Sequence, residues 1–156
     1  MMTYSPKFFV SIFFCALVFT CAFCSSALAQ QQPADSSLYT RIGGYDFVAR
    51  FVDTAFPRVA GNPQLKRLFQ GHSLDSQMKQ RQLIVDALCQ STGGPCIYIG
   101  RPMKPLHAGL GITTEDWNTF MTIISATLDE LQTSTQNKQA FLDMFDRFRD
   151  DVIDTL

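Results

Sequence analysis

The sequence predicts a single all-α domain, preceded by a short segment that does not belong to the fold. Apolar residues recur at three- and four-residue spacing in several stretches, which is the period of a helix with one buried face. Capping residues and Gly or Pro signals separate these stretches. No stretch alternates apolar and polar residues as a half-buried strand does. The length of 156 residues fits one compact domain, and we find no internal repeat.

Residues 1–29 carry the pattern of a secretory signal peptide. Lys7 precedes an apolar run at 8–24, and Ala27-Leu28-Ala29 supplies the small residues that a signal peptidase requires. We therefore expect a periplasmic or secreted protein that begins at Gln30 and has no stable membrane insertion after cleavage. In the main alternative, the run stays uncleaved as a membrane anchor, since about 17–25 apolar residues span a bilayer. A lipid anchor on a cysteine of that run is a weaker option.

The remaining chain is expected to consist of a disordered leader at 30–36 and a folded domain at 37–156. The whole sequence holds 13 basic and 14 acidic residues with no run of like charge, so it carries no electrostatic footprint for nucleic acid. Its 14 phenylalanines offer flat apolar surface that can line a core or a pocket.

The first two helices are expected at the start of the domain. Asp35-Ser36-Ser37 offers N-caps for a short helical turn through Ile42, and Gly43-Gly44 ends that turn. From Tyr45 onward, apolar side chains return every three or four residues, which predicts a longer helix. Pro57 lies inside this stretch, and we expect it to kink or shorten the helix because it removes a backbone donor.

Further helices follow after a brief apolar cluster. A third helix is expected to begin near Ser73, and residues 91–105, rich in Gly and Pro, are expected to form an irregular loop. Loops of that length are often functional. Thr113 and the acidic residues behind it predict another helix start. The last helix is expected to run from about Asn137 to Ile153.

Histidine is the residue type best suited to metal chemistry in this chain. There are two, His72 and His107, and neither has a second His, Asp or Glu at the spacing of a tetrahedral zinc site. Cys89 and Cys96 fall in no metal-binding or cofactor-attachment pattern, and we favour a disulfide between them over two free thiols. Taken alone, a histidine behind a Pro-containing loop is more often structural than a ligand.

Two blocks of the sequence resemble the group I truncated haemoglobins. Residues 37–44, SLYTRIGG, look like the opening motif of that family. The second block matches in order and spacing: GGP at 93–95, YxGRxM at 98–103 and HAGLGI at 107–112. The resemblance covers nearly the whole domain, and its most specific part is the block at His107. It implies a shortened globin whose helices pack two over two around haem b.

The resemblance makes His107 the proximal iron ligand, carried on a short helix. A neutral imidazole donates to Fe(II) from one side of a porphyrin and leaves the opposite position open for a gas. Met103, four residues earlier, would pack on the ring plane from the same side. A methionine can itself bind iron, but here both ligands would approach from one side, and we reject that arrangement.

The same resemblance assigns the distal side of the pocket. Phe56 stands where many relatives have a tyrosine, and Phe69 is the phenylalanine packed against the haem. Met78 and Gln82 are expected to project from the third helix into the pocket, with Gln82 as the main hydrogen-bond donor to the gas. This alignment needs one extra residue between Gly71 and Met78.

Three basic residues, Arg81, Arg101 and Lys104, are candidates to meet the haem propionates. His72 is expected in an exposed loop. The implied function is reversible binding of dioxygen, nitric oxide or carbon monoxide. One alternative is nitric oxide dioxygenation, which needs an electron donor and is less favoured because the chain shows no reductase module. The other is a haem-free helical interaction domain in which His107 is merely structural.

Overall fold

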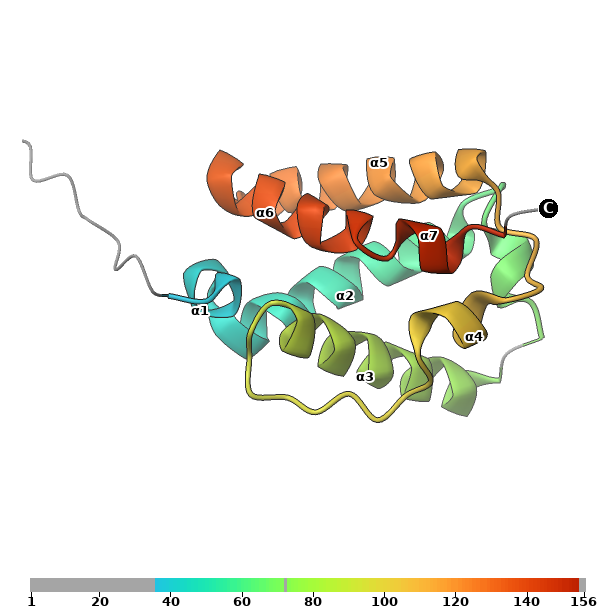
Figure 1. The fold of residues 1–156 in the computed structure, drawn as a ribbon, viewed down its shortest axis with the longest axis horizontal. Helices are drawn as coiled ribbons and strands as arrows, with labels where there is room; N and C mark the ends of the chain where they lie inside the picture. The colour runs from blue at the N-terminus through green and yellow to red at the C-terminus, as the bar shows by residue number, and fades with distance from the viewer. Residues whose placement is uncertain (1–35, 72, 155–156) are drawn as a thin grey trace, which may run out of the picture. The chain divides into compact units, whose positions relative to one another are not determined.

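The computed structural model describes residues 36–71 and 73–154, and this part of the chain contains helices and no strand (Figure 1). The predicted all-α class is confirmed. The elements are α1 Leu38–Ile42, α2 Gly44–Gly61, the 3-10 turn η1 Lys66–Phe69, α3 Leu74–Ser91, α4 Met103–His107, α5 Thr114–Glu130, α6 Thr135–Asp146 and α7 Arg149–Val152. The predicted signal peptide, most of the leader and His72 lie outside the described residues. Within these residues, no helix has the length and apolar character needed to cross a membrane.

Two helix pairs form the body of the domain. α2 packs against both α3 and α5, and α5 packs against α6. In Figure 1 the α2 and α3 ribbons form one layer and the α5 and α6 ribbons the other. α4 leaves this body and packs against α7. The arrangement matches the predicted two-over-two sandwich.

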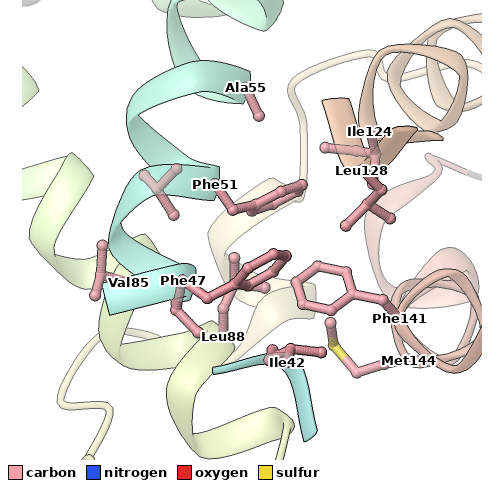
Figure 2. Packing of buried hydrophobic residues seen from close by; sticks show 12 residues of the cluster. Ile42, Phe47, Phe51, Ala55, Val85, Leu88, Ile124, Leu128, Phe141 and Met144 are labelled. Atoms are coloured by element: carbon pink, nitrogen blue, oxygen red, sulfur yellow. The ribbon is translucent and has the colours of Figure 1, made fainter. Parts of the chain in front are cut away.

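The core lies where α2 meets α5 and α6 (Figure 2). The rings of Phe51 and Phe141 pack edge to face with centroids 4.9 Å apart. Leu128 and Met144 close around them, and all four side chains are almost fully buried. Burying a side chain of this size contributes roughly 1.5–3 kcal/mol. This cluster makes α2 the central helix of the domain, in contact with α3 on one side and α5 on the other.

The predicted helix starts near Ser37, Ser73 and Thr113 are confirmed. The hydroxyls of Ser37 and Ser73 accept hydrogen bonds from the backbone N–H three residues later. Thr113 forms a capping box with Asp116, in which each side chain accepts from the other residue's backbone N–H. Such caps each contribute about 1 kcal/mol because they satisfy donors that have no partner inside the helix.

Pro57 does not shorten α2, contrary to the sequence prediction. The helix continues past it to Gly61. Pro57 is exposed on the outer face of α2, as is Asp53, whose carbonyl has lost its intrahelical donor. Water can satisfy that carbonyl, so the lost hydrogen bond does not end the helix.

The predicted loop at 91–105 and the predicted last helix also need correction. α4 begins inside the loop, at Met103, and Pro105 lies in its first turn, where backbone N–H groups have no intrahelical partner in any case. The last helix is interrupted after Asp146, and α7 follows at Arg149. A tight hydrogen bond of 2.8 Å from Phe148 N to the Phe145 carbonyl oxygen marks the interruption.

Candidate functional site

The two helix pairs and α4 enclose a cavity of about 800 Å³. That volume lies within the range of small-molecule and cofactor sites. Its wall is mostly apolar, with aromatic and aliphatic side chains from α2, α3, α5 and α6. The polar residues in the wall are Ser76, Lys79, Gln80, Ser91, Tyr98, Arg101, His107 and Asp116.

His107 is the last residue of α4, and its side chain lines the cavity. Its Nδ1 atom lies 2.8 Å from the carbonyl oxygen of Met103, one turn earlier. A carbonyl oxygen can only accept, so Nδ1 carries the hydrogen, and in the neutral ring Nε2 then holds the lone pair. A backbone carbonyl in this role fixes the tautomer and orientation of a metal-binding histidine. Nε2 is therefore the ring nitrogen through which His107, as a residue of the cavity wall, could bind a metal.

Phe56 and Phe69 also line the cavity, from α2 and η1. Their rings meet edge to face with centroids 5.6 Å apart. Met103 and Arg101 belong to the wall as well. Five of the residues singled out from the sequence are thus gathered around one cavity.

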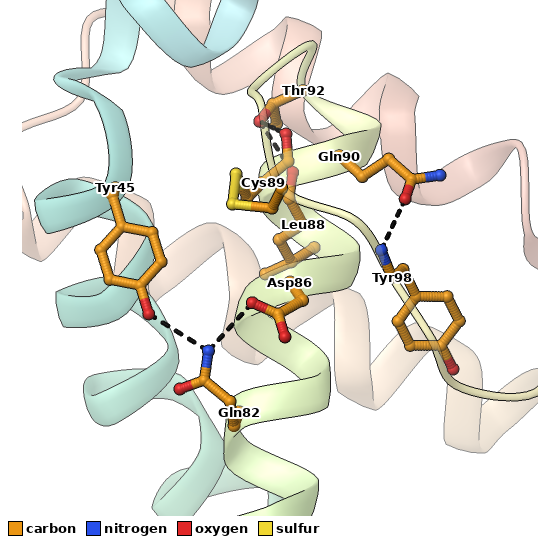
Figure 3. Close-up of a disulfide and its surroundings, with 9 residues drawn as sticks. Tyr45, Gln82, Asp86, Leu88, Cys89, Gln90, Thr92 and Tyr98 are labelled. Atoms are coloured by element: carbon orange, nitrogen blue, oxygen red, sulfur yellow. Dashed lines mark hydrogen bonds between the residues drawn. A yellow bond between two sulfur atoms is a disulfide. The ribbon is translucent and has the colours of Figure 1, made fainter.

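Met78 and Gln82 do not point into the cavity, contrary to the sequence prediction. The Met78 side chain is 60% exposed. The Gln82 amide donates to the Tyr45 hydroxyl of α2 at 3.2 Å and to the Asp86 carboxylate at 2.9 Å (Figure 3), and Gln82 does not line the cavity. Each residue turns a helix by about 100°, so a shift of two residues in the alignment moves a side chain to the opposite face.

Two of the predicted basic residues, Arg81 and Lys104, lie outside the cavity wall. Arg81 donates to both carboxylate oxygens of Asp53, at 2.7 and 2.8 Å. The hydrogen bond from Arg81 lowers the pKa of the Asp53 carboxyl below its ordinary value. Arg81 is therefore engaged with α2 and lies outside the cavity wall. Lys104 is exposed on α4 and does not contribute to the wall either.

Gln80 and Lys79 are two of the cavity residues that the sequence did not predict. The Oε1 atom of Gln80 is buried and has no hydrogen-bond partner among the described residues. The apolar stripe of α3 held the signal that could have found it, because Gln80 precedes Ile84 and Leu88 by one and two helical turns. All three residues line the cavity.

The loop between α3 and α4 forms one edge of the cavity and is held to α3. The predicted disulfide joins Cys89 and Cys96, whose Cα atoms are 5.7 Å apart. Tyr98 N donates to the Gln90 side chain at 2.7 Å (Figure 3), and the Tyr98 hydroxyl donates to the Arg101 carbonyl at 2.8 Å. In Figure 1 the loop runs back along α3 toward α4. These contacts fix the stretch that brings Tyr98 and Arg101 to the cavity.

Asp116 brings a buried carboxylate to the edge of the cavity next to η1. The side chain is 3% exposed. Its oxygens accept from the Gln64 amide at 2.9 Å, from Thr113 N at 3.0 Å and from the Arg67 guanidinium. Burial by itself raises the pKa of Asp116, but these donors outweigh burial and hold it below its ordinary value. Asp116 thus stays ionised and ties η1 to the start of α5.

Comparison with known proteins decides the family. The sequence pattern of the bacterial-like globin family matches residues 37–154. The chain belongs to the bacterial-like globin family. Among its relatives, the group 1 truncated hemoglobin GlbN of Nostoc commune is 32% identical over 108 residues, which cover 69% of this chain and 89% of that protein. The group 1 truncated hemoglobin GlbN of Mycolicibacterium paratuberculosis is 37% identical over 78 residues, covering 50% of this globin and 55% of the relative.

Solved structures agree on the fold. The Fe(III) form of the truncated hemoglobin of Tetrahymena pyriformis superposes with a TM-score of 0.70 at 22% identity, covering 77% of this globin and 100% of that chain. THB1 of Chlamydomonas reinhardtii superposes with a TM-score of 0.64 at 25% identity, covering 79% of this globin and 100% of that chain. The predicted truncated globin fold is therefore confirmed.

Proposed function

We propose that this globin binds haem b through the Nε2 atom of His107 and reversibly binds dioxygen or another diatomic gas. The proposal depends on the hydrogen bonding and position of the His107 imidazole. Its Nδ1 is committed to the Met103 carbonyl at 2.8 Å, so its lone pair is directed away from that bond, in a residue that lines an apolar cavity of about 800 Å³. Haem held there by His107 would supply an iron centre that can bind a diatomic gas.

The remaining wall suits a porphyrin. The apolar side chains of α2, α5 and α6 offer the surface that the macrocycle needs, while Lys79 and Arg101 supply positive charge for its propionates. Arg81, which is paired with Asp53, takes no part. Cation–carboxylate hydrogen bonds are among the stronger ones in proteins, so Lys79 and Arg101 would orient the group as well as retain it.

On the distal side, Gln80 would donate a hydrogen bond to the bound gas. The donor in that bond would be the Nε2 amide group, since the side chain lines the cavity and its oxygen, unpartnered among the described residues, can only accept. Phe56 and Phe69 contribute rings but no donor. Dioxygen, nitric oxide and carbon monoxide are the ligands that we expect in such an apolar chamber.

We also propose that residues 1–29 direct export to the periplasm or the exterior. The Cys89–Cys96 disulfide supports an oxidising compartment, because cytosolic proteins seldom keep such bonds. Purified chain from the periplasmic or culture fraction should begin at Gln30 when its N-terminus is determined. Cytosolic retention of the uncut chain would contradict this proposal.

The test of haem binding is the absorption spectrum of the purified protein reconstituted with haemin. We expect a strong Soret band that His107→Ala abolishes and that added imidazole restores in this variant. Lys104→Ala is the matched control, since it removes an exposed side chain from the same helix and should leave the spectrum unchanged. A protein that stays colourless, or a His107→Ala variant with the native spectrum, would contradict the proposal.

A further inference from the structure

The chain that follows α4 is held by a carboxylate from near the C-terminus. Asp154 Oδ1 accepts a hydrogen bond from Gly109 N at 3.3 Å, and its Oδ2 accepts one from Gly111 N at 2.6 Å. The backbone N–H of Asp154 donates to the Ile112 carbonyl at 3.0 Å. A single residue thus joins the C-terminal segment to the loop that follows His107.

The loop after α4 has few hydrogen bonds of its own: Leu110 N donates to the His107 carbonyl at 3.2 Å. Gly109 and Gly111 adopt φ values of +78° and +63°, which only glycine adopts readily. The loop is exposed on its outer side. α4 itself has only five residues, and helices of that length are not stable alone. The direction of α4, and with it the position of His107, therefore depends on what anchors its ends.

A second contact holds the same loop from the other side. Arg67 of η1 donates to the Gly111 carbonyl at 3.1 Å and also to the buried carboxylate of Asp116. The amide of Gly111 is bound by Asp154 and its carbonyl by Arg67. Arg67 is itself bound to α5 through Asp116. The loop is therefore held between α5 on one side and Asp154 on the other.

We propose that Asp154 is a positioning residue for His107, which sets the distance and tilt of the imidazole relative to the haem iron. This inference rests on the proposed function of His107 as the iron ligand. The two N–H bonds to a charged carboxylate are stronger than bonds to a neutral acceptor. Their loss frees the loop, so that His107 reaches the iron over a wider range of geometries.

The test compares Asp154→Ala and Asp154→Asn with the native haem-loaded protein. We expect Asp154→Ala to shift and broaden the iron–histidine stretching band of the ferrous protein in resonance Raman spectra, and to raise the rate of haem transfer to apomyoglobin about tenfold. Asp154→Asn should give an intermediate result, since one amide oxygen can replace only part of the carboxylate. In the haem-free protein, the Gly109 and Gly111 amides should exchange with deuterium faster in both variants.

Asp151→Ala is the matched control, because it removes an exposed carboxylate from the same segment. It should leave the band, the transfer rate and the exchange rates unchanged. If both Asp154 variants kept the native iron–histidine band and the native transfer rate, the inference would be overturned, even if their melting temperature fell. The proposed function would still stand in that case, provided that His107→Ala abolished the Soret band. If the native ferrous protein showed no iron–histidine band at all, the proposed function would fail together with this inference.

Discussion

The rings of Phe56 and Phe69 meet edge to face on the cavity wall, with centroids 5.6 Å apart. Neither ring carries a hydroxyl, so the part of the wall that they form offers no hydrogen-bond donor. In this part of the site, a bound gas would be held by shape and apolar contact. The polar stabilisation must then come from α3, where Gln80 lines the cavity.

A hydroxyl added at position 56 should therefore slow the release of dioxygen. We expect Phe56→Tyr to reduce the dissociation rate about tenfold, since a hydrogen bond to a partly charged ligand contributes about 1–3 kcal/mol. Stopped-flow displacement of dioxygen from the ferrous protein measures this rate. Phe56→Leu, which changes the ring but adds no donor, should not slow release. Equal or faster release from Phe56→Tyr would contradict the prediction.

Removal of the Gln80 amide should have the opposite effect. We expect Gln80→Leu to release dioxygen about tenfold faster, because the bound gas loses its donor from α3. Gln82→Leu is the control, since the Gln82 amide is bound to Tyr45 and Asp86 outside the cavity. Its release rate should stay within about twofold of the native value. If Gln82→Leu released dioxygen faster than Gln80→Leu, Gln82 would be the donor, as the sequence predicted.

That difference between Gln80 and Gln82 shows what the sequence could not provide. The apolar period of α3, its start at Ser73 and its cavity-facing residues Ile84 and Leu88 are local properties and could be predicted. The assignment of the distal glutamine instead depended on the length of the η1–α3 connection. An error of two residues there turns a side chain by about 200°, which is enough to exchange the buried and exposed faces.

The surroundings of His107 were more predictable because their geometry is local. The hydrogen bond from His107 to Met103 spans four residues of one helical turn, and the sequence placed both residues correctly around the cavity. The break between α6 and α7 could not be predicted, since no Gly or Pro occurs at 147–148. There, tertiary packing outweighs helix propensity, as the contact of α7 with α4 indicates.

The two basic residues in the cavity wall should control haem retention. We expect Lys79→Ala and Arg101→Ala each to speed haem transfer to apomyoglobin several-fold, because each removes a charge-assisted contact to a propionate. Arg81→Ala should leave transfer unchanged, since Arg81 forms a surface ion pair with Asp53. Faster transfer from Arg81→Ala than from the other two would contradict the assignment.

The disulfide should stabilise the domain through its unfolded state. In the chain-entropy account, a bond that closes so short a loop contributes roughly 2–3 kcal/mol. We expect the double variant Cys89→Ala, Cys96→Ala to lose about this much free energy of unfolding in urea titrations. Reductant should lower the stability of the native protein to a similar extent and leave the variant unchanged. A native protein insensitive to reductant would show that the bond adds little.

Asp116 should make the stability of the domain depend on acid pH. Its folded pKa lies below the ordinary value of about 3.9, so its contribution is fully present at higher pH and is lost as the pH falls through the folded pKa. We expect Asp116→Asn to lower the free energy of unfolding at pH 7 by about 1–3 kcal/mol. In the variant, stability should also fall less steeply below about pH 5 than in the native protein.

The control for that experiment is Glu115→Gln, which removes an exposed carboxylate from the same first turn of α5. Its unfolding free energy should follow the native curve across the whole acid range, since a solvated carboxylate gains little from folding. Urea titrations between pH 2 and pH 7 compare the three proteins. If this account holds, the free energy of unfolding of Asp116→Asn will not keep the native dependence on pH below pH 5. The same dependence would mean that the donors of Gln64, Thr113 and Arg67 do not favour the ionised carboxylate, and that packing alone joins η1 to α5.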